Sequence, residues 1–149
     1  MKRIMFVCHG NICRSPMAEF IMKDLVEKRG LSEEFEINSC ATSTEEIGND
    51  IYPPARAELQ RRGIKTEKRR AVQLKKEDYD RYDLIICMED YNLRNIKRII
   101  REDPLSKIKK LLDYKNGGDV ADPWYSGRFD IAYRDILSGC EALLEKLMS

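Results

Sequence analysis

Short apolar segments alternate along this chain with longer segments in which apolar residues recur every three or four positions. The first pattern is typical of strands and the second of helices, and a chain that alternates between them forms a parallel sheet covered by helices. Strands are expected at 3–7, 35–39 and 83–88, with an edge strand at 107–114. The 149 residues fit one domain, so the sequence predicts an α/β fold that occupies 1–149.

The ends of the expected helices carry recognisable capping residues. Ser15 is the expected N-cap of the first helix, because Pro16 follows it at the position where proline is favoured. Gly30 stands where a left-handed C-terminal cap is expected. Residues 41–52 show no period, and loops of that length tend to be functional. Helices are expected at 16–29, 53–62, 93–100 and 129–147.

Charge and cysteine content exclude several classes of protein. Lys and Arg number 27 against 26 Asp and Glu, and the net charge of +1 gives no field that would recruit nucleic acid or an anionic membrane. The longest apolar runs have five residues, whereas a membrane span needs about 20. The start of the chain lacks the features of a signal peptide. Five cysteines without a C-x-x-C pair indicate neither a disulfide framework nor structural zinc, so we expect reduced thiols in a cytoplasmic protein.

The most informative segment is 7–16, Val-Cys-His-Gly-Asn-Ile-Cys-Arg-Ser-Pro, between the first strand and the first helix. Gly10 and Asn11 tolerate left-handed backbone angles, so the loop between Cys8 and Arg14 can curl until successive N–H groups point inward and form an anion-binding nest. The helix N-terminus adds partial positive charge, and the planar guanidinium of Arg14 matches two phosphate oxygens. The segment therefore predicts a site for a tetrahedral oxyanion.

Cys8 is the candidate nucleophile of this site. It stands at the end of the strand beneath the nest, where the field that binds an anion also stabilises a thiolate. The hydroxyl of Ser15 can donate to that sulfur, which makes the sulfur a better leaving group when a cysteinyl-phosphate is hydrolysed. We therefore expect covalent catalysis at Cys8.

Asp122 is the candidate general acid, because cleavage of a phosphoester requires a proton donor for the departing oxygen. Pro123 restricts the backbone of Asp122 to an extended conformation, which holds the carboxyl group out from the loop. Trp124 and Tyr125 follow and can form the walls of a slot for a substrate ring. The sequence thus indicates a phosphoester that carries a ring.

These segments resemble the low molecular weight protein tyrosine phosphatases. Residues 7–16 match the family signature Val-Cys-x-Gly-Asn-x-Cys-Arg-Ser-Pro, and Asp122-Pro123 followed by two aromatic residues matches the general-acid loop. Between them, 83–88 and the residues that follow are similar to the central strand and next helix of the family. The resemblance therefore covers nearly the whole chain.

The resemblance implies a Rossmann-like four-stranded parallel sheet with helices on both faces. It also implies a Cys8 nucleophile, a phosphoryl group held by Arg14, Asp122 as acid and then base, and a loop supported by Asn11 and Ser15. No metal or other cofactor is implied. The expected partners are phosphotyrosine-containing proteins or peptides, and the expected state is a monomer or weak homodimer. The candidate substrate-binding residues are His9, Gly10, Asn11, Ile12, Cys13, Ser15, Trp124 and Tyr125.

Two departures from the family pattern bear on specificity and on support of the loop. The aromatic residue common in the loop after the second strand is replaced near Glu45 or Glu46, so we expect an altered substrate preference. The family's His and Arg before the third helix align with Arg69 and Val72, so the hydrogen bonds that brace Asn11 are expected to be supplied differently.

Several side chains have two interpretations. Cys13 either packs beneath the loop or traps an oxidised Cys8 as a reversible disulfide. His9 is expected at the rim without a catalytic role, and at least one of Trp124 and Tyr125 is expected to face the substrate. Six basic residues are expected to form a solvated face, with steering of acidic phosphopeptides as the alternative. They are Arg61, Arg62, Lys65, Lys68, Arg69 and Arg70.

The leading hypothesis is a phosphatase that acts on phosphotyrosine in proteins. Arsenate reductases of the same fold need a second close pair of cysteines, which Cys87 does not have. Phosphatases for phosphoarginine tend to carry Thr at the position of Ile12, so Ile12 favours phosphotyrosine. A module that binds phosphate without cleaving it would not need both Cys8 and Asp122.

Overall fold

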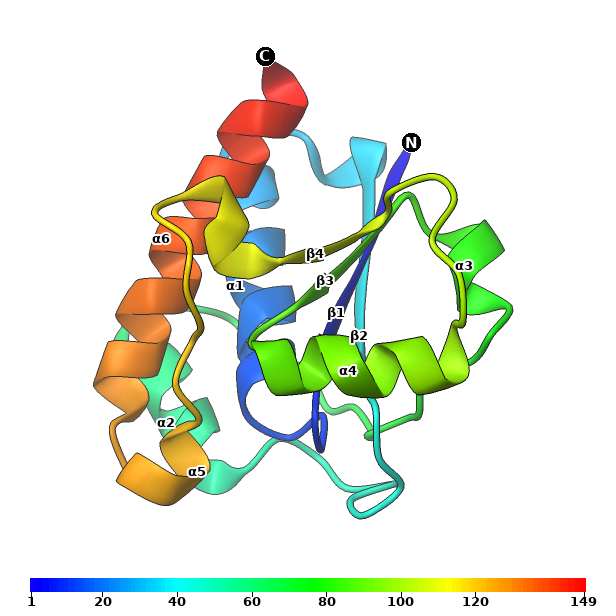
Figure 1. The fold of residues 1–149 in the computed structure, drawn as a ribbon. Coiled ribbons are helices and arrows are strands. Elements are labelled where there is room, and N and C mark those ends of the chain that lie inside the picture. Colours follow the sequence, from blue (N-terminus) through cyan, green and yellow to red (C-terminus); the bar gives the residue numbers. More distant parts are fainter.

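The computed structural model describes residues 1–149 and has a four-stranded sheet at its centre, with all neighbouring strands parallel. The strand order is β2-β1-β3-β4 (Figure 1). The strands are β1 (Lys2–Cys8), β2 (Phe35–Ala41), β3 (Leu84–Cys87) and β4 (Ile108–Lys110). The order reverses at β1, because the chain leaves β1 for β2 on one side and reaches β3 on the other. Ligands of such sheets bind beyond the carboxyl ends of the strands at this point.

Helices connect the strands and confirm the expected ones at 16–29, 53–62, 93–100 and 129–147 to within a few residues. Two further helices of four residues each, α3 and α5, are too short to leave a periodic pattern in the sequence. The helices are α1 (Arg14–Lys28), α2 (Pro53–Arg61), α3 (Asp78–Arg81), α4 (Asp90–Ile99), α5 (Pro123–Ser126) and α6 (Phe129–Met148). The 3₁₀ helices are η1 (Ser32–Glu34) and η2 (Leu111–Tyr114).

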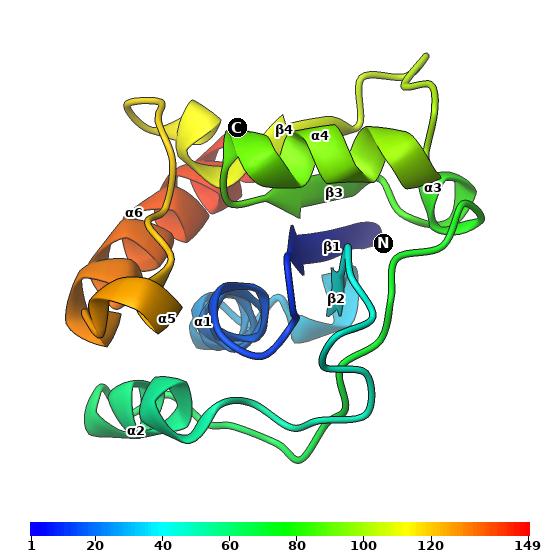
Figure 2. The ribbon, with the colours of Figure 1, turned by 60° about the horizontal axis from the view of Figure 1, so that its bottom comes forward.

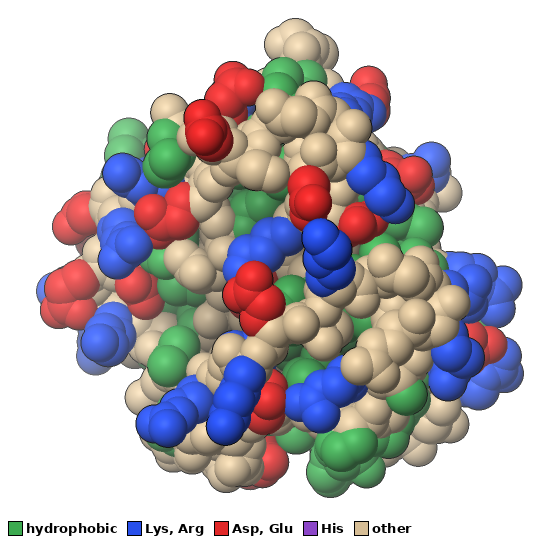
Figure 3. All heavy atoms as spheres, turned by 180° about the vertical axis from the view of Figure 1, so that it is seen from behind, with side chains coloured by type: hydrophobic (Ala, Val, Ile, Leu, Met, Phe, Trp, Pro, Cys, Tyr) green, Lys and Arg blue, Asp and Glu red, His purple; other side chains and the backbone are tan.

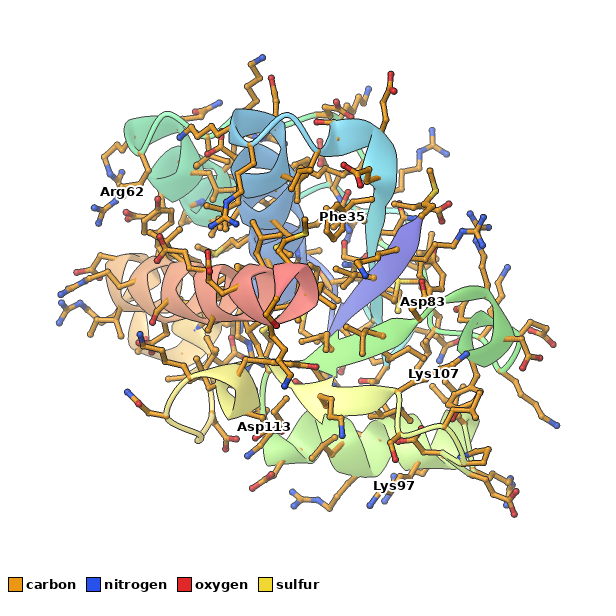
Figure 4. All side chains as sticks on the ribbon, turned by 90° about the horizontal axis from the view of Figure 1, so that it is seen from above. Phe35, Arg62, Asp83, Lys97, Lys107 and Asp113 are labelled. Atoms are coloured by element: carbon orange, nitrogen blue, oxygen red, sulfur yellow. The ribbon has the colours of Figure 1, made fainter.

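The two faces of the sheet are covered by different helices, as expected. Alternate residues of β1 point to opposite faces, so Ile4 and Phe6 join the larger apolar core while Met5 and Val7 join a smaller one. Figure 4 shows α1, α2 and α6 on one side of the sheet and α4 on the other. Each face is thereby shielded from water, which is the usual condition of a parallel sheet.

The expected edge strand at 107–114 is too long. Only Ile108–Lys110 pairs with β3, and the chain then turns into η2. Leu111 is fully buried, and a Cβ atom placed on Gly139 of α6 would lie 2.6 Å from its Cγ atom. Burial of Leu111 against this glycine draws the chain out of the strand direction, which is a tertiary effect that the local pattern does not carry.

The expected N-cap at Ser15 is also wrong. Helix α1 begins at Arg14, with Cys13 at the N-cap position and without a side-chain cap. Gly30 does take the expected left-handed conformation after the helix, with φ of 70°. The hydroxyl of Ser15 lies 3.0 Å from the sulfur of Cys8 instead of capping the helix. Ser15 therefore belongs to the loop site and not to the helix terminus.

Charge is dispersed over the surface. Basic and acidic side chains are interleaved on the face shown in Figure 3. Of the expected basic face, Arg62 lies 2.8 Å from Glu58, and Arg61 pairs with the same carboxylate. No helix is both long enough and apolar enough to cross a membrane.

Candidate active site

The carboxyl ends of the strands carry the candidate site. In the register of the sheet, Cys8 at the end of β1 lies opposite Ala41 at the end of β2, and Val7 lies opposite Cys87 at the end of β3. Figure 2, with this end turned forward, shows the segments after β1 and β2 together with α5 there. The fold thus brings together residues 8–14, 41–52 and 122–126, which are far apart in the sequence.

Residues 8–15 form the expected nest around the sulfur of Cys8. Asn11 has φ of 59°, a left-handed conformation that directs its N–H group to the sulfur at 3.3 Å. The N–H group of Ser15 donates to the same sulfur at 3.4 Å. Donors without an opposing acceptor favour the anionic form of the atom that they surround, so this arrangement suits a thiolate.

The hydroxyl of Ser15 is oriented by its own neighbours. The side-chain amide nitrogen of Asn11 donates to the hydroxyl oxygen of Ser15 at 2.8 Å. The hydroxyl hydrogen is then available to the sulfur of Cys8, at 3.0 Å, in preference to the Cys40 carbonyl, at 3.4 Å. Ser15 therefore acts as a third donor to the sulfur.

Asn11 is fully buried and is held from behind the nest. Arg69 donates to its carbonyl oxygen at 2.7 Å and to its side-chain oxygen at 2.5 Å. The side-chain amide nitrogen of Asn11 donates to Ser39 of β2 at 3.0 Å, and Ser39 donates in turn to Glu19 of α1 at 2.6 Å. Arg69 and the N–H group of Val72, which donates to the same side-chain oxygen at 3.3 Å, thus supply the brace, whereas Glu19 was not anticipated.

Arg14 lies at the edge of the nest with only 2% of its side chain exposed. Its guanidinium donates to Glu89 at 2.6 Å and to the carbonyl oxygen of Val120 at 2.8 Å. Burial lowers the pKa of Arg14, but the charges of Cys8, Asp122 and Glu89 outweigh burial and hold it above its usual value. The arginine is therefore a fixed cation in a fixed orientation.

Glu89 is a site residue that the sequence analysis missed. Asn92 accepts hydrogen bonds from the N–H groups of Met88 and Glu89, both at 3.1 Å, and this fixes the chain where β3 leads into α4. An acidic residue directly after a buried parallel strand was the available signal, because such strand ends meet at the site.

Asp122 reaches the same place from the other side. It is the N-cap of α5, with an extended backbone as Pro123 predicts, and one carboxylate oxygen accepts the N–H of Trp124 at 3.0 Å. The other oxygen lies 3.4 Å from the guanidinium of Arg14. The carboxyl group therefore points toward the nest and is partly exposed.

A cavity of about 570 Å³ joins these groups. Nine expected residues line it, whereas Asn11 and Ser15, also expected to bind substrate, lie behind the loop and support it. Glu45, Glu46 and Tyr91 complete the lining. The nine are Cys8, His9, Gly10, Ile12, Cys13, Arg14, Asp122, Trp124 and Tyr125.

Aromatic rings form the outer wall of this cavity. The ring centroid of Trp124 lies 4.7 Å from that of Tyr52, yet 52% of Trp124 remains exposed. Trp124 therefore both packs on the protein and faces the cavity. Tyr125 is 86% exposed, and His9 lies at the rim with its ring centroid 5.8 Å from that of Tyr91. No group of three or more His, Cys, Asp and Glu side chains is placed to hold a metal ion.

The model of one protein family, described as low molecular weight phosphotyrosine protein phosphatase, matches residues 3–149. The chain belongs to this family. The resemblance seen in residues 7–16 and 122–125 is thus confirmed over almost the full sequence. The four-stranded parallel sheet is that of a low molecular weight phosphatase.

Similar proteins agree with this assignment. A relative from Bacillus subtilis, the low molecular weight protein-tyrosine-phosphatase YfkJ, is 38% identical over 99% of this chain and 96% of its own. Its crystal structure has a TM-score of 0.95 to this chain, covering 99% of this chain and 95% of that one. The structure of a low molecular weight protein tyrosine phosphatase from Streptococcus pyogenes has a TM-score of 0.91 at 38% identity, covering 100% of this chain and 95% of that one. The structure of an arginine phosphatase from Drosophila has a TM-score of 0.88 at 30% identity, covering 100% of this chain and 99% of that one.

The other thiols of this phosphatase are held in the neutral form. Burial, followed by the charges of Cys8 and Asp122, raises the pKa of Cys13 to about 12. Burial likewise raises the pKa of Cys87 to about 12 and raises those of Cys40 and Cys140. Whether Cys13 traps an oxidised Cys8 stays a prediction.

We expect iodoacetamide at pH 7 to alkylate Cys8 first, because a thiolate is the reactive form and the other four thiols stay protonated. Peptide mass spectrometry after limited labelling should find the first adduct at Cys8, and inorganic phosphate should slow its formation. Cys40, Cys87 and Cys140 are fully buried and serve as internal controls. A first adduct at Cys13 would contradict the assignment of the nest to Cys8.

Proposed function

We propose that this phosphatase hydrolyses phosphotyrosine in proteins through a cysteinyl-phosphate intermediate on Cys8. The observation that carries the proposal is the convergence of two backbone N–H groups and the Ser15 hydroxyl on one sulfur at the floor of the cavity. Arg14 and Asp122 stand at the edge of the same nest. These are the groups that transfer of a phosphoryl group to sulfur requires.

In the first step the thiolate of Cys8 attacks phosphorus as the bond from phosphorus to the tyrosine oxygen breaks. The equatorial oxygens of the phosphoryl group lie among the nest N–H groups and the guanidinium of Arg14, which stabilise the charge that they carry in the transition state. Asp122, in its protonated form, gives its proton to the departing oxygen, and tyrosine leaves as a neutral phenol.

In the second step a water molecule hydrolyses the intermediate. Asp122 is now a carboxylate, and it takes a proton from the water molecule as the water oxygen attacks phosphorus. The phosphorus–sulfur bond breaks, and the electron pair returns to Cys8. The Ser15 hydroxyl and the N–H groups at 3.3 and 3.4 Å stabilise the sulfur anion that leaves. Phosphate departs, and the thiolate is restored.

The position of the sulfur supports an aryl substrate. Only 3% of Cys8 is exposed, and Trp124 and Tyr125 stand at the cavity wall. A phosphate on an aromatic ring is held far enough from the peptide backbone to reach that depth, and the ring can contact these side chains. The phosphate of phosphoserine is carried on a much shorter side chain. Phosphotyrosine is therefore the favoured substrate class.

Arsenate reduction is less well supported than hydrolysis. A thiol relay needs a second and third cysteine that can reach the first, but Cys40, Cys87 and Cys140 are fully buried and none lines the cavity. Cys13 alone shares the cavity with Cys8. The chain thus offers a single nucleophile with one neighbour.

We further propose that residues 1–149 act as one domain, as a monomer or weak homodimer in the cytoplasm. The match of one family model to residues 3–149 supports a single domain. Five free cysteines suit a reducing compartment.

The test is hydrolysis of p-nitrophenyl phosphate and of matched phosphotyrosine, phosphoserine and phosphoarginine peptides, with a chelator present. We expect turnover of the aryl phosphates, with kcat/KM for the phosphoserine peptide lower by about 10²-fold or more. Rapid quenching with acid should trap phosphate on Cys8. Faster hydrolysis of phosphoarginine than of phosphotyrosine would refute the substrate class, and absence of all hydrolysis would refute the activity.

A further inference from the structure

The segment between β2 and α2 places two acidic side chains at the mouth of the active site. Glu45 and Glu46 both line the cavity, and 67% of the Glu45 side chain is exposed. Glu46 extends over the nest, since a Cβ atom on Gly10 would lie 3.4 Å from its Cγ atom. Figure 2 shows this segment beside the one that follows β1. The carboxylates therefore stand where the residues that flank a bound phosphotyrosine must pass.

The cations that line the cavity do not offset these charges. Arg14 is the only Lys or Arg among the lining residues, and it is already bonded to Glu89 and to a carbonyl oxygen deep in the site. None of the six basic residues from Arg61 to Arg70 lines the cavity. Two carboxylates therefore stand at the mouth, above the buried Arg14.

His9 is hydrogen-bonded to Glu45 at the mouth. A carboxylate can only accept, so the Nε2 atom of His9 must be the donor in the hydrogen bond that joins them. The Nδ1 atom of His9 has no partner within the protein. The hydrogen bond from Nε2 orients the carboxylate of Glu45 at the rim.

Aromatic faces at the same mouth add to the attraction for cations. Tyr91 already has the guanidinium of Arg94 5.8 Å from its ring centroid, which shows this kind of contact at the rim. Trp124 and Tyr125 line the cavity with much of their surface exposed, and no Lys or Arg side chain of the protein stacks on either ring. Carboxylates beside open aromatic faces form a surface that suits Lys and Arg side chains.

We propose that Glu45 and Glu46 are specificity-determining residues that select phosphotyrosine flanked by Lys or Arg over phosphotyrosine flanked by Asp or Glu. This inference rests on the proposed function and specifies its substrate class. An exposed charge pair changes an equilibrium by up to about fivefold. Because two carboxylates act on residues on both sides of the phosphotyrosine, we expect a preference of about tenfold in kcat/KM.

The experiment compares three phosphotyrosine peptides that differ only in the flanking residues, which are Lys, Gln or Glu. It uses the wild type, the double variant Glu45→Gln and Glu46→Gln, and Glu141→Gln as a control that removes an exposed charge from α6. We expect kcat/KM of the wild type and of Glu141→Gln to be highest for Lys and lowest for Glu. The double variant should reduce the ratio to about twofold. The wild-type preference should also fall as salt shortens the Debye length below about 10 Å.

A control substrate separates this inference from the proposed function. Hydrolysis of p-nitrophenyl phosphate, which has no flanking residues, reports the activity itself. If the wild type hydrolyses it but treats the three peptides alike, the specificity inference is wrong and the phosphatase assignment stands. A Lys preference that survives in the double variant would likewise refute the roles of Glu45 and Glu46. If the wild type hydrolyses no aryl phosphate, the proposed function fails and this inference fails with it.

Discussion

The variant Cys8→Ser is expected to lower kcat for hydrolysis of aryl phosphates by about 10⁴-fold or more, as loss of a nucleophile does in other covalent enzymes. The groups around residue 8 are donors, namely the N–H groups of Asn11 and Ser15 and the Ser15 hydroxyl. Donors stabilise an anion but cannot remove a proton from a hydroxyl group. A serine at this position would therefore stay protonated and unreactive.

Binding of phosphate should survive the same substitution, because the nest and Arg14 are unchanged. We expect the dissociation constant of inorganic phosphate, measured by calorimetry, to change by less than about tenfold. This measurement distinguishes loss of the nucleophile from collapse of the loop. A Cys8→Ser enzyme that retains more than a hundredth of the wild-type rate would rule out the covalent mechanism.

The variant Asp122→Asn is expected to lower kcat/KM for a phosphotyrosine peptide by about 10² to 10³-fold, within the usual contribution of a general acid. This ratio reports the steps up to departure of the phenol, for which the amide cannot supply a proton. The decrease should be smaller for p-nitrophenyl phosphate, because its nitrophenolate leaves readily without a proton. A difference between the two substrates is specific to an acid that protonates the leaving group.

A matched control is available three residues earlier. Asp119 is an acid in the same connection, but it bonds to Lys110 at 2.9 Å and does not line the cavity. Asp119→Asn should therefore leave the ratio between the two substrates unchanged. Equal losses for both substrates in Asp122→Asn would show that Asp122 supports the site without donating a proton.

The parts of the site that are continuous in sequence could be predicted, and those assembled by tertiary structure could not. Residues 8–15 form a single loop, so spacing alone indicated a nest with Cys8 at its centre. Glu89 directly precedes α4 and Tyr91 lies in the first turn of α4, and both join the site only because β3 pairs with β1. The role of Arg69 depends on the path of the chain between α2 and α3.

The fold shows the same division. Periodicity located the strands and long helices because each contributes one continuous apolar face to a core. It failed where packing between distant segments decides the conformation, as at Leu111, whose side chain packs against Gly139 of α6. The capping pattern failed at Ser15, where a residue type typical of an N-cap supports the sulfur of Cys8 instead.

The brace behind Asn11 implies a separation of tasks within this phosphatase. Protein groups from β2 and from the β2–α3 region, and not an incoming anion, hold the loop in its left-handed turn. The cradle is thus preorganised, and a ligand loses little affinity in shaping it. Selectivity can then reside in the outer segment that carries Glu45, which contributes no group to the sulfur. Sequence change in that segment can redirect the enzyme to new targets while its chemistry stays intact.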